Sequence, residues 1–291
     1  MLHGFVVIDK PAGMTSHDVV SKLRRLAGQK RVGHGGTLDP MATGVLPIAL
    51  GNATRLLEYL QEEDQKAYLA TVRLGAATDT DDAEGQVISE APVPPLARDE
   101  LERALDQFRG AIEQVPPNYA AIRVDGRRLY SYARAGEEVP VVPARPVTIE
   151  RLELLAAEGD ELTIDVKCSK GTYIRALARD LGAALGCGAH LTALRRTQAG
   201  AFALGQAVPL QALLDEPALL PGALLAPQAA LADWPLIAVS ADEAALLGQG
   251  RRIPRLLDAP RAALLDDAGR LLAVAEAADA EWQPGKVFSW T

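Results

Sequence analysis

Residues 33–44 have the sequence GHGGTLDPMATG, and this stretch places a single carboxylate, Asp39, among turn-forming residues. Glycine is used where the backbone takes unusual dihedral angles or where another group must come close. Proline, here Pro40, fixes one backbone angle and removes a hydrogen-bond donor. A loop of this composition lets a partner approach Asp39. A surface turn with a capping aspartate has the same composition, so the stretch alone leaves both interpretations open.

Length and composition predict a soluble protein of one large domain or two. The chain has 291 residues, of which 48% are hydrophobic, so a sizeable core can form. No apolar run approaches the roughly 20 residues that span a membrane. The start, residues 1–10, lacks the basic region and the long apolar core of a signal peptide. We therefore expect a cytoplasmic protein that does not contact a membrane.

Potential metal ligands are few and scattered. Cys168 and Cys187 form no metal or redox motif, and we expect two small buried hydrophobic residues rather than a disulfide. The acidic stretch Thr78–Gly85 resembles a calcium loop only weakly, because its sixth position counted from Asp79 is Glu84 where that loop needs glycine. The histidines lack metal-ligand spacing: His3, His17, His34 and His190. We expect no bound metal.

Charge is distributed unevenly along the chain. The formal net charge is −8, yet residues 1–60 carry +3 and residues 166–204 carry +5. Residues 61–165 carry −11 and residues 205–291 carry −5. The two basic segments also hold the densest glycine motifs. A polyanion is expected to bind where they converge, with acidic surface elsewhere limiting non-specific binding; chance clustering is the alternative.

Hydrophobic patterns predict a mixture of strands and helices. A short apolar strand over residues 5–10 precedes a turn, and Ser16 is expected to cap a helix from about His17 to Ala27. Alternation predicts further strands, and a one-sided apolar pattern predicts further helices. The strands are 67–74, 147–155 and 161–168, and the helices are 98–109 and one opened by residues 171–175 that runs to about 185. Residues 116–146 hold five arginines and three tyrosines, and we expect a long excursion there.

The tail is expected to be distinct and rich in strands. It begins at Trp234-Pro235, and residues 261–266 and 270–276 form a hairpin around Asp267-Ala268-Gly269. Neighbouring strands and hairpins are mixed with helices along the whole chain. This order predicts an α+β core followed by a small β-rich tail domain.

One isolated carboxylate restricts the chemistry. A glycosidase with paired carboxylates would need a second acid at fixed separation, and none is identifiable. A carboxylate can still act as a nucleophile toward a sugar or an electrophilic ring carbon, provided that it stays ionised and oriented. Arginine suits this task because its fork binds a carboxylate at two points and stays charged. Arg175, in the second basic segment, is the candidate partner.

Five motifs occur in the order found in a known family. They are Asp9–Ser16, the Gly33–Gly44 stretch, Thr78–Gly85, the segment PPNYAAIRVDGRRLYSYAR and Cys168–Arg175. Over about residues 4–200 the chain resembles the bacterial TruB family of tRNA pseudouridine-55 synthases. The tail resembles an RNA-binding module of the PUA type.

The resemblance implies an architecture. It implies an α+β pseudouridine synthase fold, with a mixed sheet core and flanking helices, over residues 1–232. It also implies a PUA-like RNA-binding domain over residues 233–291. Residues from about 116 to 146 resemble the family's mobile thumb loop. Ala120 and Arg123 depart from the family pattern, which has serine and lysine there, so local hydrogen bonding in this loop is expected to differ.

The resemblance also implies roles for individual residues. Asp39 corresponds to the nucleophile, Tyr68 to the tyrosine that stacks on the target base, and Arg175 to the arginine that pairs with the aspartate. Other positions correspond to residues that bind or surround the substrate. These are His34, which enters the RNA loop, Tyr173 below the uracil, Leu194 in an apolar wall, and Lys10, Arg55 and Asp82 near the active site or the RNA.

The implied reaction is isomerisation of uridine to pseudouridine at position 55, in the T-loop of tRNA. A base in a folded loop must be extruded before its ring can react, and aromatic faces can then hold it. No redox change or group transfer occurs, so no cofactor is expected. The expected partner is the T-arm of tRNA, bound by a monomer.

Three other functions remain open. The chain could be a tRNA-folding chaperone, alongside or without catalysis, although the presence of Asp39, Tyr68 and Arg175 argues against a purely non-catalytic protein. A guide-RNA-dependent synthase of the dyskerin type is disfavoured by the short tail without a long basic extension. A nucleoside hydrolase would need a water-activating base, which we cannot identify.

Overall fold

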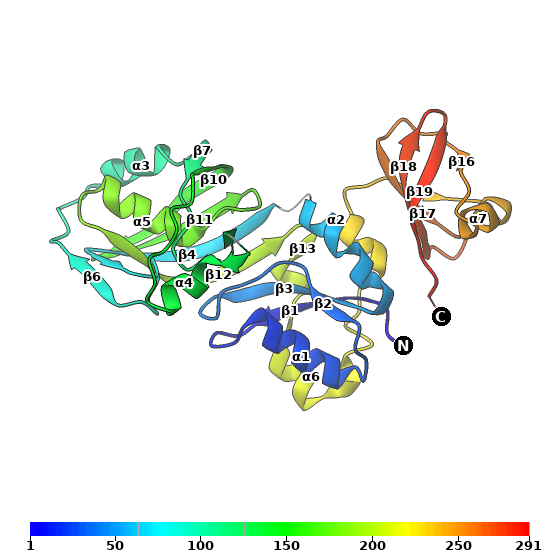
Figure 1. The fold of residues 1–291 in the computed structure, drawn as a ribbon, viewed down its shortest axis with the longest axis horizontal. Coiled ribbons are helices and arrows are strands. Elements are labelled where there is room, and N and C mark those ends of the chain that lie inside the picture. Colours follow the sequence, from blue (N-terminus) through cyan, green and yellow to red (C-terminus); the bar gives the residue numbers. More distant parts are fainter. Residues whose placement is uncertain (63–64, 121, 125, 291) are drawn as a thin grey trace. The chain divides into compact units, whose positions relative to one another are not determined.

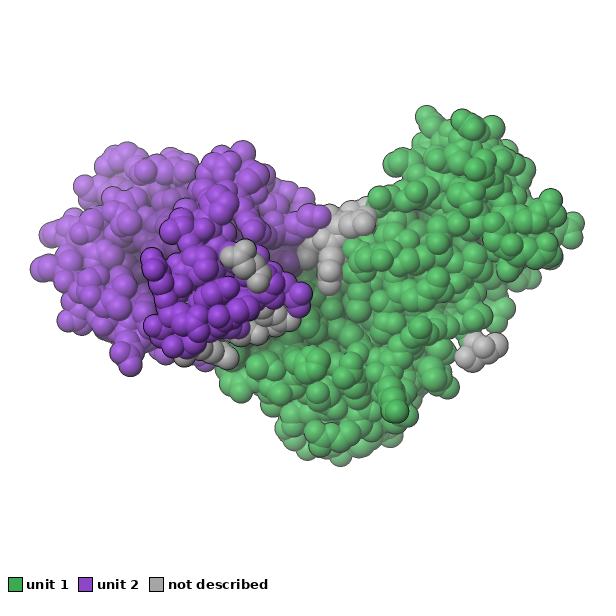
Figure 2. All heavy atoms as spheres, in the orientation of Figure 1, with its two compact units in different colours: residues 1–40, 44–63, 199–291 green, residues 41–43, 64–198 purple. Residues whose placement is uncertain are grey.

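The computed structural model describes residues 1–62, 65–120, 122–124 and 126–290. It divides into two compact units (Figure 2). Unit 1 comprises Met1–Pro40, Gly44–Glu63 and Ala199–Thr291, and unit 2 comprises Met41–Thr43 and Asp64–Gln198. Among the described residues, no helix combines the length and the apolar character that crossing a membrane requires.

The first half of unit 1 is built on apolar strands. Strand β1 (Gly4–Lys10) pairs antiparallel with β3 (Thr43–Leu50) and parallel with β14 (Val208–Pro209), while β2 (Val32–His34) pairs with β3. Both β1 and β3 are buried along nearly their whole length, as their sequences GFVVIDK and TGVLPIAL require. The strand expected over residues 5–10 is confirmed.

Helices lie beside these strands. Helix α1 (Ser16–Leu26) buries Val19, Val20 and Leu23, and Figure 1 draws it with α6 on one side of β1 and β3. The expected cap is wrong by one residue: Thr15, not Ser16, accepts from the Asp18 amide and closes a capping box. The other short elements are η1 (Gly51–Leu56), α2 (Leu57–Glu62), β13 (Phe202–Ala203), η2 (Leu204–Gln206), α6 (Leu210–Asp215), η3 (Pro217–Leu219) and η4 (Pro227–Leu231).

The tail of unit 1 folds as a five-stranded sheet in the order β15-β17-β18-β19-β16. The predicted hairpin is confirmed, since β17 and β18 pair antiparallel across the turn at Gly269. The bounds are β15 (Leu236–Ala238), α7 (Ala241–Gly248), β16 (Ile253–Pro254), β17 (Arg261–Leu265), β18 (Leu271–Ala278) and β19 (Glu281–Val287). Side chains from β17 and β18 and Phe288 share a hydrophobic core with Phe5 and Phe202. Apolar burial therefore ties this sheet to the first half of unit 1.

Unit 2 contains the strand order β4-β11-β10-β7, with β12 (Ala189–Ala199) next to β4. All neighbours from β4 to β7 pair antiparallel. The bounds are β4 (Lys66–Leu74), β7 (Gly110–Gln114), β10 (Arg145–Glu158) and β11 (Glu161–Cys168). The three strands predicted from alternation are confirmed, and β10 extends beyond its predicted ends.

Two helices of unit 2 match their predictions closely. Helix α3 (Arg98–Asp106) buries Leu101, Ala104 and Leu105. Helix α5 (Ile174–Ala184) is buried over most of its length. The remaining elements are β5 (Ala76–Thr78), β6 (Val87–Glu90), β8 (Arg123–Val124), β9 (Arg127–Arg128) and α4 (Leu129–Arg134). The excursion expected over residues 116–146 thus holds a small hairpin and a helical turn. Both cysteines are buried, and neither forms a disulfide within the described residues, as expected.

Candidate active site

The loop that carries Asp39 is anchored on both sides of this residue. The Ser16 hydroxyl accepts from the Leu38 amide at 2.8 Å and lies 3.2 Å from the Leu38 carbonyl, to which it donates. On the other side, the Pro40 carbonyl accepts from the Gly13 amide at 2.9 Å. Asp39 itself is partly exposed. The carboxylate therefore stands on a fixed backbone and still has access to solvent.

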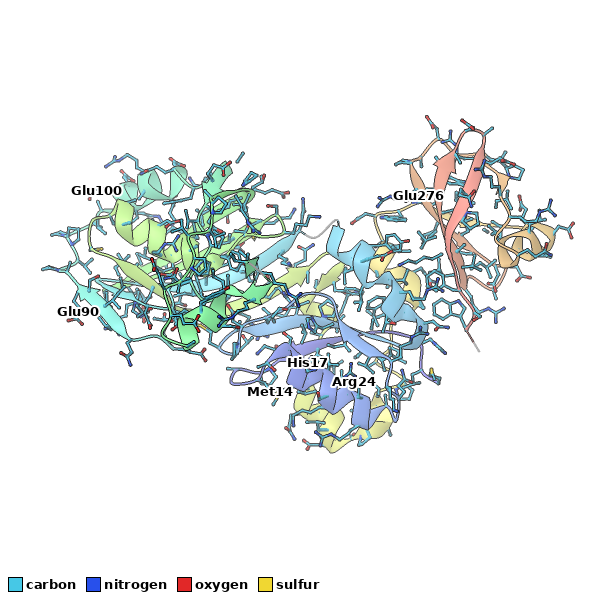
Figure 3. All side chains as sticks on the ribbon, in the orientation of Figure 1. Met14, His17, Arg24, Glu90, Glu100 and Glu276 are labelled. Carbon is cyan, nitrogen blue, oxygen red and sulfur yellow. The ribbon has the colours of Figure 1, made fainter. Side chains whose placement is uncertain are left out.

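Lys10 is the second anchor of this loop. It is fully buried, and its Nζ donates to the carbonyls of Pro11, Met14 and Pro40 at 2.9, 2.6 and 3.2 Å. An ammonium group has three N–H donors, and three carbonyls accept here. Met14 is labelled in Figure 3, just before α1. These bonds support a positioning role for Lys10, whereas its expected contact with RNA stays a prediction.

Glycines allow the backbone conformation of this loop. Gly36 has a φ of 111° and Gly44 one of 97°, both in the region that favours glycine. A Cβ added to Gly35 would lie 2.4 Å from the Leu60 side chain. Glycines in this stretch thus have the unusual dihedrals and the close approach that the composition predicts, whereas the approach of a partner to Asp39 stays a prediction.

Two further candidates in unit 1 lie in regular elements. His34 ends β2 and pairs in register with Ile48. Arg55 lies in η1, where its Nη1 donates to the Val287 carbonyl at 2.6 Å and its guanidinium lies 4.9 Å from the centroid of the Phe288 ring. The structure thus gives Arg55 a packing role against the end of β19, and its expected contact with RNA stays a prediction.

In unit 2 the structure brings Arg175 and Asp82 together. Both are nearly buried, with Arg175 Nη1 3.5 Å from Asp82 Oδ2. The same guanidinium donates to the carbonyls of Thr80 and Tyr119 at 3.1 and 3.3 Å. Asp82 also accepts from the Thr80 hydroxyl at 2.5 Å and from the Glu84 amide at 3.1 Å. The predicted arginine and the predicted aspartate therefore belong to one buried network.

A second ion pair adjoins the first. Arg179 Nη1 donates to Asp81 Oδ2 at 3.0 Å. Burial raises the pKa of the Asp81 carboxyl above its ordinary value, and the charges of Arg179 and Arg175 act against this rise. Neither Asp81 nor Arg179 was among the residues expected from the sequence.

Tyr173 is held at the start of α5 by reciprocal bonds with a buried glutamine. Its amide donates to Gln114 Oε1 at 2.8 Å, and its carbonyl accepts from Gln114 Nε2 at 3.1 Å. Its ring packs against a small core of Ala120, Leu129 and Val142. The thumb-like segment thus contacts the residue that is expected to lie below the uracil.

Tyr68 and Leu194 are both buried strand residues. Tyr68 lies on β4 opposite Val166 of β11, and Leu194 lies on β12. Their burial is compatible both with packing in the core and with lining a pocket. The contact of Tyr68 and Leu194 with a base therefore stays a prediction.

The sequence-based interpretation missed several residues that fix the site. Ser16 was expected to cap α1, but its hydroxyl forms hydrogen bonds to the backbone of Leu38 in the Asp39 loop. Arg179 follows Arg175 by four positions in α5, a spacing that places two side chains on one helix face. That spacing was the available signal. Nothing in the sequence indicated the role of Gln114, because its partners are the backbone amide and carbonyl of Tyr173, which no residue pattern marks.

Comparison with known proteins identifies the family. A family described as TruB family pseudouridylate synthase (N terminal domain) matches residues 24–174. This chain belongs to the TruB family. Two further TruB descriptions match the remainder: tRNA pseudouridylate synthase B C-terminal domain over residues 175–223, and tRNA Pseudouridine synthase II, C terminal, over residues 234–289. The resemblance stated from the motifs is confirmed.

TruB relatives are similar over nearly their whole length. The chain is 50% identical over 279 residues to tRNA pseudouridine synthase B of Synechococcus sp. (strain WH7803), covering 92% of this chain and 91% of the relative. It is 46% identical over 288 residues to the enzyme of that name from Azoarcus sp. (strain BH72), covering 99% and 93%.

A solved structure supports the TruB fold. A chain from a structure described as a Cbf5-Nop10-Gar1 complex is similar with a TM-score of 0.77 and 26% identity, covering 99% of this chain and 85% of that one. The predicted α+β pseudouridine synthase fold with a β-rich tail is thereby confirmed.

Proposed function

We propose that this TruB chain converts uridine to pseudouridine at position 55 in the T-loop of tRNA, with Asp39 as the nucleophile. Membership of the family makes it a tRNA pseudouridine synthase. One observation about this chain carries the assignment of Asp39: the residues on either side of it are anchored by Ser16, Gly13 and Lys10. A carboxylate presented on a fixed loop meets the positional requirement for attack.

The reaction rearranges one nucleoside without any co-reactant. Asp39 adds to the sugar or to the uracil ring, and the bond between N1 and the ribose C1′ breaks. The base turns and a new bond forms between C5 and C1′. The proton on C5 then leaves to solvent or to a nearby base, and N1 takes up one proton, so that the product is an isomer of uridine. Asp39 is then released. Atoms and electrons balance, so the proposed mechanism uses no cofactor and no metal.

The other candidate residues receive roles from this reaction. Tyr68 stacks on the extruded base, which is worth about 1–3 kcal/mol, and Tyr173 and Leu194 line the pocket. Arg175 pairs with Asp39 and orients it, while the network with Asp82 holds the guanidinium of Arg175 in place. His34 enters the space that the base leaves, while Lys10 and Arg55 support the RNA-binding elements.

The proposal extends to organisation. Residues 1–232 act as the catalytic domain with a thumb at 116–146, and residues 233–291 act as a PUA-like domain that binds RNA. The protein acts as a monomer in the cytoplasm and binds the T-arm of tRNA.

The experiment is incubation of an unmodified tRNA transcript with the purified protein. Pseudouridine is isomeric with uridine, so mass spectrometry follows chemical derivatisation of the product. We expect one modified nucleotide at position 55 and none in a transcript that carries cytidine there. Modification at another position would contradict the T-loop assignment.

The same experiment distinguishes the alternatives. A guide-RNA-dependent enzyme would leave the transcript alone unmodified, and a folding chaperone would speed transcript folding without forming pseudouridine. A hydrolase would release free uracil, which chromatography detects.

Binding is expected to be electrostatic and local despite the acidic total charge. Of the adjacent arginines in the second basic segment, Arg196 is fully buried, so its neutralisation would test folding, whereas Arg195 is partly exposed. Replacing the partly exposed Arg195 with glutamine is expected to weaken tRNA binding and to reduce the slope of log affinity against log salt by roughly one unit.

The matched control is Arg103→Gln, which removes an exposed arginine from α3 in the acidic segment. It is expected to change binding much less. Filter binding across a salt series measures both variants. Equal losses would show that the basic segments do not mark the RNA path.

A further inference from the structure

Two consecutive aspartates face two arginines one helical turn apart. Asp81 and Asp82 follow each other in the loop after β5, while Arg175 and Arg179 are four positions apart on α5. The ion pairs run in parallel, Arg175 with Asp82 and Arg179 with Asp81. The proposed mechanism uses the first pair and leaves the second without a role.

Asp81 occupies a constrained backbone position. Its φ is 60°, in the left-handed region that few residues other than glycine, asparagine and aspartate adopt. Its amide donates to the Thr78 carbonyl at 3.2 Å, and its carbonyl accepts from the Leu191 amide of β12 at 3.1 Å. The loop is thus fixed at Asp81, one residue before the partner of Arg175.

Arg179 connects this loop to the start of the thumb-like segment. Besides Asp81, its guanidinium donates to the Val115 carbonyl at 2.9 Å. Val115 directly precedes residues 116–146, and Arg175 bonds the Tyr119 carbonyl four residues further on. Both arginines therefore bridge the acidic loop and the root of the thumb-like segment.

We propose that Arg179 and Asp81 form a positioning pair that sets the acidic loop and the root of the thumb-like segment around Arg175. The pair does not touch the reacting atoms. It fixes Asp82 through the adjacent backbone and Tyr119 through the chain that leaves Val115. This inference rests on the proposed function, because it assigns the pair to the orientation of Arg175.

Burial disfavours the charge on Asp81. Burial raises the folded-state pKa of Asp81 above its ordinary value of 3.8. The stabilising contribution of the protonated carboxyl is therefore present below pH 3.8 and is lost as the pH rises through the folded-state pKa. At neutral pH the buried charge on Asp81 therefore costs stability, which the charges of Arg179 and Arg175 offset in part. A costly charge in such a place is typical of functional sites.

The test separates orientation from folding. Arg179→Met and Asp81→Asn are each expected to lower the single-turnover rate by roughly tenfold to 100-fold, the scale of a small misplacement of catalytic groups. Asparagine tolerates the left-handed backbone, so Asp81→Asn keeps the loop conformation and should leave the melting temperature nearly unchanged. The affinity for tRNA should change little in both variants.

A double-mutant cycle tests whether the two residues act together. The double variant is expected to be no slower than the slower single variant, because both substitutions break one pair. Arg179→Lys keeps the charge opposite Asp81 and is expected to recover part of the rate. The control is Arg73→Met, which breaks an exposed ion pair with Asp160 elsewhere in unit 2 and should not alter the rate.

Each outcome bears on one claim. Additive losses in the double variant, or losses that follow the unfolded fraction in thermal melts, would overturn the positioning role. Normal rates in Arg179→Met and Asp81→Asn would also overturn it, while an inactive Asp39→Asn would leave the proposed function intact. Normal turnover by Asp39→Asn would instead refute the proposed function.

Discussion

Asp39→Asn is expected to abolish pseudouridine formation while tRNA binding persists. Asparagine keeps the shape of the side chain but removes the anion that we propose as the nucleophile. The anchors act on backbone atoms of Leu38 and Pro40, through the Ser16 hydroxyl, the Gly13 amide and the Lys10 ammonium group, so the substitution leaves these bonds in place. The loss should be on the order of 10⁴-fold or more in rate, the scale seen when a covalent nucleophile is removed.

The measurement combines a derivatisation assay for pseudouridine with a binding titration. Asp215→Asn is the matched control, since Asp215 is an exposed aspartate of the same unit at the end of α6. It should keep full activity. Turnover by Asp39→Asn near that of the unchanged protein would rule out Asp39 as the nucleophile.

The regular elements were largely predictable because burial on one face leaves a period in the sequence. Strand β11 begins and ends where alternation places it, at Glu161 and Cys168. The cap of α1 was displaced because Thr15 and Ser16 are adjacent and both can cap. Ser16 does not cap the helix because its hydroxyl bonds the Leu38 amide, 22 residues away in the chain.

The Asp39 loop was predictable, but its anchors were not. Glycine and proline leave a local signal of unusual dihedrals, and Gly36 and Gly44 have them. The acceptors of Lys10 are backbone carbonyls, which every residue carries, so no pattern of side chains marks them. The bond from Lys10 to the Pro40 carbonyl therefore depends on the tertiary fold, which brings the end of β1 next to the turn at Pro40.

Charge counts along the chain do not identify which residues are exposed to a partner. A segment total treats every arginine as exposed, yet Arg196 is fully buried and Arg55 packs on Phe288. Arginine buries its aliphatic stem readily and pairs its head with carbonyls. A basic segment therefore predicts a binding region better than it predicts which residues bind.

Arg175→Lys is expected to lower the rate by roughly 100-fold or more with little change in tRNA affinity. The guanidinium spans acceptors from two segments, the Thr80 carbonyl at 3.1 Å and the Tyr119 carbonyl at 3.3 Å, and lies 3.5 Å from Asp82. An ammonium group keeps the charge but is a point donor without the planar fork. A lysine at this position can bond either the Thr80 carbonyl or the Tyr119 carbonyl, but not both at once.

Arg175→Met separates charge from geometry. Methionine leaves the buried Asp82 with the Thr80 hydroxyl and the Glu84 amide as its donors among the described residues, and removing one partner of a buried pair typically costs about 3–5 kcal/mol. We therefore expect a lower free energy of unfolding for Arg175→Met and a nearly normal one for Arg175→Lys, measured by denaturant titration. If the lysine variant were both stable and fully active, the fork would be unnecessary, and pairing of Arg175 with Asp39 would have to be abandoned as the means of orienting the nucleophile. A stable but slow lysine variant would place the effect in the orientation of the reacting groups, because charge and fold would both be preserved.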